Sequence, residues 1–181
     1  MLPKYHFLLL LLLPVLCWTA CEKSIFNPQP AAKVLPPITM TGAGTFGCKI
    51  NGEVFLHTPK AFDDHIYVEY NPRSSKFQLF AIESVDNSYH RNISIVQYNV
   101  LDTGAYTLTK GKYNILDSEC MTIHGLTEEH FVLDEPNEIT ISRFDSEERI
   151  ISGTFRYTLY SEACQDTFRI TEGRFDMPWL K

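Results

Sequence analysis

Apolar and polar residues alternate along much of the chain after residue 45, as they do in strands that bury one face. The clearest segment runs from Ile151 to Leu159, where every second residue is apolar or glycine and the residues between them are polar. This alternation is typical of an antiparallel strand with one face in a hydrophobic core. No segment repeats apolar residues at helical spacing over three turns, so the pattern favours strands.

Three pairs of such segments are separated by short polar stretches, and we therefore predict three hairpins. The strongest signal is Asn51-Gly52, because both residues tolerate the positive φ that a two-residue hairpin turn requires. The predicted pairs are 46–50 with 53–56, 76–85 with 91–100, and 138–144 with 151–159.

The last strands are predicted at 168–170 and 175–177, on either side of a turn at Glu172-Gly173. One short helix is considered, either at Thr127–His130 or around Pro59–Asp63. The pattern thus predicts an all-β fold for a single domain over residues 45–181. Its expected architecture is an antiparallel β-sandwich or barrel of about eight to ten short strands.

The first twenty residues have the pattern of a secretory signal. The ten residues from Phe7 to Leu16 are apolar throughout. They are too few to span a bilayer, which needs about 20 residues in a helix, but they fit the apolar region of a signal peptide. The following Trp18-Thr19-Ala20-Cys21 resembles the lipobox of bacterial lipoproteins. This resemblance implies that residues 1–20 are removed and that Cys21 carries acyl chains; simple secretion is the alternative.

Residues 21–44 hold four of the ten prolines and form the predicted lipidated tether. Proline-rich segments are extended and semi-rigid, so we expect a spacer between membrane and domain. Val34, Leu35 and Ile38 leave open that this segment is instead a strand docked on the domain edge.

The charge of the chain limits its partners. There are 16 basic and 22 acidic residues, giving a formal net charge of −6. A nucleic-acid partner would call for a basic stripe, so none is expected. Because acidic residues outnumber basic ones, a polybasic membrane-binding surface is not expected either. The acyl chains are the expected contact with the membrane.

Three cysteines remain beyond the tether. Cys120 and Cys164 lie in polar segments, whereas Cys48 lies inside a predicted strand. Because the compartment beyond the inner membrane is oxidising, we predict a disulfide between Cys120 and Cys164. Cys48 is expected to pack as a small apolar side chain.

One cluster offers the residue types of a metal site. His124, Glu128 and His130 lie within seven residues, and imidazole and carboxylate groups are zinc ligands. Their spacing matches no established site and no HExxH motif is present, so we expect no metal and no cofactor. The formal GxGxxG at 42–47 precedes a hairpin rather than a helix, so a flexible entry to the first strand is the better interpretation.

Tyrosines offer a further candidate site, a carbohydrate or peptide groove. Strands use tyrosine heavily in their cores and rims, so packing is the competing interpretation. The candidates are Tyr67, Tyr70, Tyr98, Tyr106, Tyr113 and Tyr160.

Three segments, Thr45–Gly52, Ile151–Phe155 and Ile170–Asp176, resemble the signature pieces of a family of small lipoproteins from Bacteroidetes-type bacteria. The pieces occur in the same order as in that family and cover both ends of the predicted domain. The resemblance implies an all-β lipoprotein of the outer membrane and supplies no catalytic residue.

The sequence therefore predicts a non-enzymatic, lipid-anchored β module of the cell envelope that binds a ligand or partner. Two alternatives stay open. One is a metal-dependent hydrolase that uses His124, Glu128 and His130, and the other is a barrel that carries a small apolar ligand.

Overall fold

The computed structural model describes residues 32–57, 66–84, 90–108, 110–116, 129–131, 135–161 and 165–179. It divides the chain into two units, Met1–Ala32 and Lys33–Lys181, and the second unit is the one described below. The described residues contain eleven strands, and every strand pair among them is antiparallel. No helix in these ranges has the length and hydropathy needed to cross a membrane.

The strands form two sheets. The larger sheet has the order β2-β1-β11-β10-β9-β6. The additional strand β8 pairs with β10 on the same edge as β9. Its strands are β1 (Thr45–Ile50), β2 (Glu53–Leu56), β6 (Gly104–Thr107), β8 (Glu129–Phe131), β9 (Glu138–Asp145), β10 (Ile150–Ser161) and β11 (Asp166–Pro178). The smaller sheet has the order β3-β4-β5-β7. Its strands are β3 (Ile66–Asn71), β4 (Lys76–Ser84), β5 (His90–Gln97) and β7 (Lys110–Leu116).

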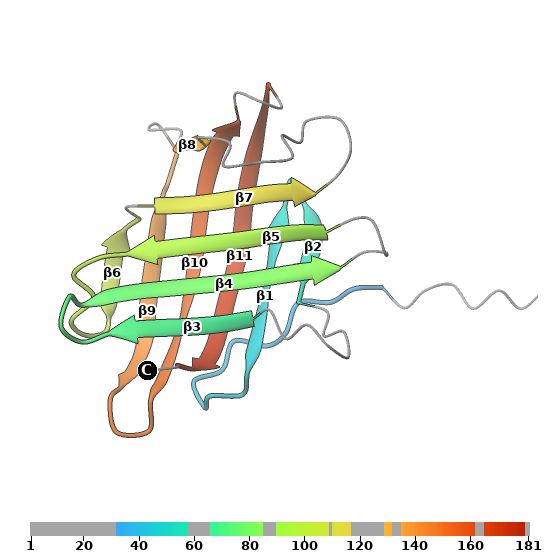
Figure 1. The fold of residues 1–181 in the computed structure, drawn as a ribbon. Helices are drawn as coiled ribbons and strands as arrows, with labels where there is room; N and C mark the ends of the chain where they lie inside the picture. The colour runs from blue at the N-terminus through green and yellow to red at the C-terminus, as the bar shows by residue number, and fades with distance from the viewer. Residues whose placement is uncertain are drawn as a thin grey trace, which may run out of the picture. The chain divides into compact units, whose positions relative to one another are not determined.

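The two sheets pack face to face, with the strands of the smaller sheet running across those of the larger one (Figure 1). One continuous apolar core fills the space between them. In this core Phe77 of β4 packs against Phe175 of β11, and the centroids of the two rings are 5.5 Å apart. The all-β prediction is therefore confirmed, and the architecture is a two-layer antiparallel sandwich with crossed strands.

The three predicted hairpins are confirmed. β1 pairs with β2, β4 with β5, and β9 with β10. At the first of these turns, Asn51 has φ 49° and Gly52 has φ 89°, as a two-residue turn requires. The predicted alternation along β10 is also confirmed on its core face, where Ile151, Tyr157 and their apolar neighbours are buried.

The predicted turn at Glu172-Gly173 is wrong. β11 is one strand of thirteen residues, and Glu172 forms a β-bulge within it, with φ 51°. Phe155 of β10 pairs with Gly173, but Tyr157 pairs with Ile170, so β11 holds one extra residue. Since β11 is paired on both sides, by β1 and β10, a bulge keeps the ladders that a turn would break.

A second difference concerns the short helix, of which the alternative position around Pro59–Asp63 lies outside the described residues and the position at Thr127–His130 is described in part. Glu129 and His130 lie in β8, where they pair with Ser161 and Tyr160 of β10. This short strand extends the edge of β10 beyond the end of β9. Tertiary pairing with an open strand edge has overridden the local preference of these residues.

The segment at 33–44 lies on the domain. Arg174 Nη1 donates to the Pro36 carbonyl at 3.2 Å, and Arg143 Nη1 donates to the Met40 carbonyl at 2.6 Å. Leu35 and Pro36 come so close to Gly47 that a Cβ there would lie 2.8 Å from the proline ring. This part of the predicted tether is therefore in contact with the domain, but it forms no strand.

Candidate functional site

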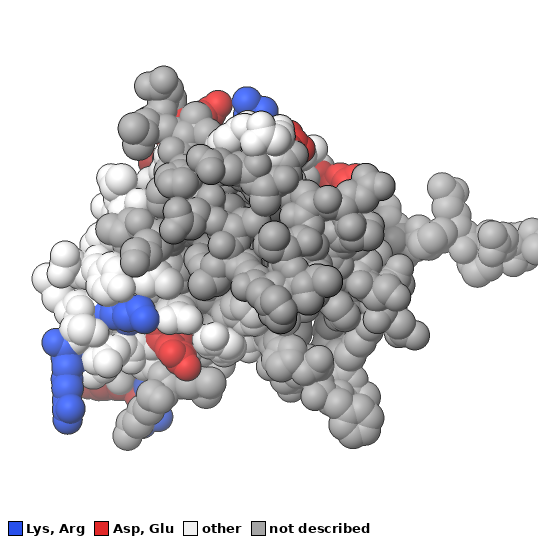
Figure 2. All heavy atoms as spheres, turned by 45° about the horizontal axis from the view of Figure 1, so that its top comes forward, with Lys and Arg blue, Asp and Glu red and all other residues white. Residues whose placement is uncertain are grey.

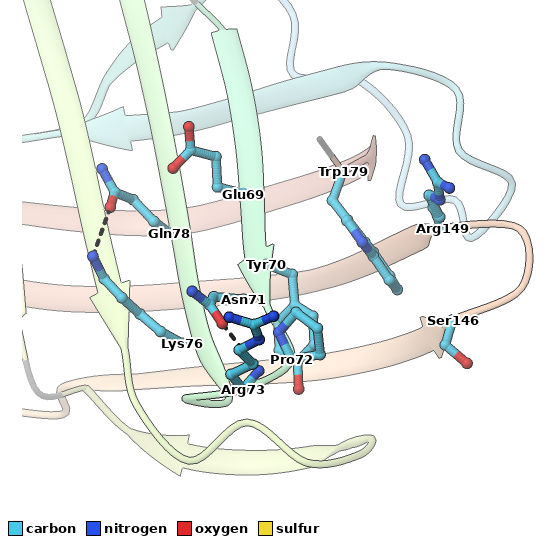
Figure 3. A pocket seen from close by; sticks show the side chains of 10 residues that line it. All are labelled: Glu69, Tyr70, Asn71, Pro72, Arg73, Lys76, Gln78, Ser146, Arg149 and Trp179. Atoms are coloured by element: carbon cyan, nitrogen blue, oxygen red, sulfur yellow. Dashed lines mark hydrogen bonds between the residues drawn. The ribbon is translucent and has the colours of Figure 1, made fainter. Parts of the chain in front are cut away.

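A groove of about 780 Å³ opens at one end of the sandwich. Three elements form it: the turn between β3 and β4, the turn between β9 and β10, and the end of β11 (Figure 3). The groove is lined by Glu69, Tyr70, Asn71, Pro72, Arg73, Lys76, Gln78, Ser146, Arg149 and Trp179. Its volume lies within the roughly 300–1,000 Å³ that small-molecule sites occupy.

Aromatic rings form the floor of the groove. The Trp179 indole extends from the end of β11 toward Tyr70 (Figure 3), and their ring centroids are 5.5 Å apart. Phe144 of β9 stacks on Trp179 at 5.3 Å and meets Tyr70 edge-on at 4.9 Å. The Tyr70 hydroxyl donates to the Val100 carbonyl at 2.8 Å. These contacts fix the floor, because each ring is held by two others.

Cationic side chains stand on two sides of this floor. Arg73 and Lys76 come from the β3–β4 side, and Arg149 comes from the β9–β10 turn (Figure 3). Lys76 Nζ donates to Gln78 Oε1 at 3.1 Å. Within the described part of the chain, no acidic side chain lies within ion-pair distance of any of the three cations. One carboxylate, Glu69, also lines the groove.

Local hydrogen bonds fix the two turns that carry the arginines. Asn71 Oδ1 accepts the backbone N–H of Arg73 at 3.0 Å. In the other turn, Asp145 Oδ1 accepts the backbone N–H of Glu148 at 2.9 Å. Arg149 has φ 56°, and its carbonyl accepts a hydrogen bond from the backbone N–H of Trp179 at 2.9 Å. The residue with this positive φ is therefore the one whose carbonyl holds Trp179 in place.

The carboxylate of Asp145 is ionised in this turn. The hydrogen bond from Arg143 lowers the pKa of Asp145 below its usual range, and the backbone N–H of Glu148 lowers it further. Arg143 also pairs with the Glu148 side chain at 2.5 Å. The turn that carries Arg149 is thus held by a charge-assisted hydrogen bond between Arg143 and Asp145.

A second polar cluster surrounds Asp176 on β11, which is 1% exposed. Its carboxylate accepts hydrogen bonds from Ser152 Oγ at 2.6 Å, Thr39 Oγ1 at 2.7 Å and the backbone N–H of Gly42 at 2.7 Å. Burial raises the pKa of Asp176, but these hydrogen bonds outweigh it and hold the pKa well below its usual range. The cluster attaches the 39–43 segment to the sheet.

A third cluster is the buried ion pair between Glu83 of β4 and Arg91 of β5, which face each other in register. Glu83 also accepts from Lys33 Nζ at 2.6 Å. Arg91 lies over the Phe55 ring of β2, with its guanidinium carbon 5.7 Å from the ring centroid. The cluster joins β2, the smaller sheet and the N-terminal segment, so its role is structural.

Cys48 lies beside this ion pair and is fully buried, as predicted. Burial raises the pKa of the Cys48 thiol far above its usual range, which keeps the sulfur protonated and unreactive. Cys48 therefore acts as a small apolar side chain between the sheets.

Most residues predicted to carry chemistry lie outside the described residues. These are Cys21, Cys120, Cys164, His124 and Glu128. His130 lies in β8, where only its backbone is described. Lipidation, the disulfide and the metal alternative therefore stay predictions. Among the described side chains, no three His, Cys, Asp or Glu gather closely enough to hold a metal ion.

The side chains of five of the six candidate tyrosines are described, all but that of Tyr113, and one of the five lines the groove. Tyr70 lies on its floor, whereas Tyr67 stacks on Phe80 of the neighbouring strand at 5.3 Å. Tyr106 donates its hydroxyl to the Asp102 carbonyl at 2.6 Å. Sequence reasoning missed Trp179, Arg73 and Arg149, because only the crossing of the two sheets brings these distant turns together.

The comparisons with known proteins add no relative. We find no protein-family model, no curated protein and no solved structure that matches this chain.

Proposed function

We propose that this protein is a non-enzymatic, lipid-anchored binding module of the cell envelope, held at the outer membrane by acyl chains on Cys21. In this proposal the ligand occupies the groove above Trp179. The observation that carries the proposal is the combination of a fixed aromatic floor with cations that have no acidic partner among the described residues.

The N-terminal sequence supports the anchor. A lipobox-like Trp18-Thr19-Ala20-Cys21 follows an apolar segment of signal-peptide length. Acyl chains contribute about 0.8 kcal/mol per buried CH₂, so two or three chains give stable attachment. A domain attached in this way stays at the membrane without a membrane-binding surface of its own.

The geometry supports ligand binding in the groove. Tyr70 and Trp179 are 9% and 8% exposed, and the contacts described above hold them without a ligand. A site that is already formed loses little entropy on binding. Unpaired arginines on fixed turns are expensive to desolvate unless a ligand supplies their counter-charge, so they favour a partner with acceptor groups.

Fractionation tests the anchor. The full chain is expressed with and without Cys21→Ala, and with and without globomycin, which blocks the lipoprotein signal peptidase. We expect the wild-type chain in the membrane fraction and its precursor to accumulate under globomycin. If the Cys21→Ala chain is processed normally and stays with membranes, lipidation at this residue is wrong.

Tryptophan fluorescence tests the groove. The chain has two tryptophans, Trp18 and Trp179, so in a Trp18→Phe background Trp179 is the single reporter whether or not the signal is removed. We expect at least one size-fractionated envelope extract to shift its emission saturably. The shift should be lost when Arg73 and Arg149 are also replaced by alanine. If no extract shifts Trp179 emission, the binding function is wrong.

A further inference from the structure

We infer that the groove above Trp179 binds an acidic oligosaccharide, that is, linked sugars carrying carboxylate or sulfate groups. This inference rests on the binding site proposed above and is independent of the lipid anchor. It follows from three properties of the groove: its charge, the little aromatic surface that it leaves open, and its neutral polar side chains.

The first property is the local charge. Figure 2 shows one face of the molecule, where basic and acidic side chains both appear among the described residues. Among the described residues that line the groove, Arg73, Lys76 and Arg149 accompany a single carboxylate, Glu69. The chain as a whole has a net charge of −6, so this excess of cations is a local feature. Guanidinium groups bind carboxylate and sulfate oxygens through paired hydrogen bonds.

The second property excludes a flat aromatic anion. A base or another ring system would need an open aromatic face on which to stack. Phe144 already stacks on Trp179, with an angle of 15° between the rings, and Tyr70 packs against it as well. Trp179 is 8% exposed, so it can offer a small apolar contact, such as the CH groups of a sugar ring, but not a stacking platform.

The third property is the set of neutral polar groups beside the cations. Asn71, Gln78 and Ser146 line the groove and can exchange hydrogen bonds with hydroxyl groups. Glu69 would repel a ligand that carries only negative groups, such as an acidic peptide. It can accept hydrogen bonds from sugar hydroxyls, which an acidic oligosaccharide has beside its charges.

Binding is tested with the full Trp18→Phe chain in detergent, with Trp179 emission as the readout. The probes are trigalacturonate, a heparin-derived tetrasaccharide, the neutral maltotriose and hexaglutamate. We expect trigalacturonate, the heparin fragment or both to shift the emission saturably. Maltotriose and hexaglutamate should each bind roughly tenfold more weakly or worse, since each lacks one of the two required features.

Matched variants place the site. Replacing both Arg73 and Arg149 with alanine should weaken binding of the acidic sugar roughly tenfold or more. Arg169→Ala, an exposed arginine on β11 outside the groove, should leave the affinity unchanged. All three arginine side chains are exposed, so melting curves of the variants should match the parent chain and exclude misfolding as the cause.

The negative outcomes differ from one another. Equal affinity for maltotriose would refute the requirement for charge, and tighter binding of hexaglutamate would identify a peptide site instead. If envelope extracts shift Trp179 emission but neither acidic sugar does, this inference is wrong and the proposed function stands. If nothing shifts the emission, both are wrong.

Discussion

Asp176 shows how a single residue can hold a whole segment in place. Its carboxylate accepts hydrogen bonds from both backbone and side-chain donors at 39–43, and from Ser152 on the adjacent strand. A carboxylate fits here because it accepts several hydrogen bonds and donates none. An amide of the same shape would turn an NH₂ group toward these donors.

We therefore expect Asp176→Asn to lower the free energy of unfolding by about 2–3 kcal/mol at pH 7. The pKa of Asp176 is lower in the folded state than the roughly 3.9 of an unfolded chain, so folding favours the charged form. This stabilisation is complete above about pH 5 and declines as the pH falls below about 4. Urea unfolding from pH 7 to pH 3 measures both effects. A variant whose stability falls with acid as steeply as the wild type would contradict the assignment.

Gly153 is a second residue whose identity is dictated by its neighbours. A Cβ there would lie 2.1 Å from the Thr140 carbonyl oxygen on β9, and this backbone atom cannot move without disturbing the β9–β10 pairing. We expect Gly153→Ala to cost about 1–3 kcal/mol or more, measured by thermal or urea unfolding. The neighbouring Thr154→Ala, on the opposite face, should change stability by less than about 0.5 kcal/mol. Equal losses in the two variants would remove the steric argument.

At the scale of elements, the buried Glu83–Arg91 pair joins β4 to β5 and brings both against β2. Removing Arg91 leaves the buried Glu83 carboxylate with the half-exposed Lys33 as its remaining charged partner among the described residues, so we expect Arg91→Met to lower the free energy of unfolding by about 3–5 kcal/mol. Adding Glu83→Leu should recover much of this loss, because replacing both charges with apolar groups is often neutral. Urea unfolding of the single and double variants measures the coupling. If the double variant is less stable than Arg91→Met, Glu83 stabilises the junction by some route other than this pair.

The elements also show what could be predicted from sequence. The hairpins at β1–β2, β4–β5 and β9–β10 were predictable, because each has its alternation and its turn residues next to each other in the chain. The bulge at Glu172 was predicted as a turn. Turns and bulges both contain a residue with positive φ, so the local sequence does not distinguish them. β3, β6 and β7 carried no such signal and were not located. Their positions depend on pairing with strands that the sequence pattern does not identify.

At the scale of the whole molecule, the groove was not predictable for a related reason. Tyr70 and Arg73 are separated from Arg149 by more than 70 residues, and from Trp179 by more than 100. The crossing of the two sheets brings the β3–β4 turn, the β9–β10 turn and the end of β11 to one end of the sandwich (Figure 1), and the groove residues belong to these parts of the chain. The tyrosine content of the chain suggested a groove, but the sequence did not indicate which of the six candidate tyrosines lines it. Packing against Phe144 and Trp179 distinguishes Tyr70 from the other candidates whose side chains are described.

The N-terminal segment also belongs to the domain as a whole. Lys33 binds Glu83 of the smaller sheet, whereas Thr39 and Gly42 bind Asp176 of the larger one, so residues 33–44 contact both layers.

We expect a chain that begins at Thr45 to be less stable than one that begins at Lys33 by roughly 3 kcal/mol or more, because several charge-assisted hydrogen bonds are lost. Urea unfolding of the two chains at pH 7 measures this difference. In the shorter chain Asp176 loses its donors at 39–43, so Asp176→Asn should cost much less there than in the longer one. Equal stability of the two chains, or an undiminished effect of Asp176→Asn in the shorter one, would show that the segment only rests on the sandwich and does not stabilise it.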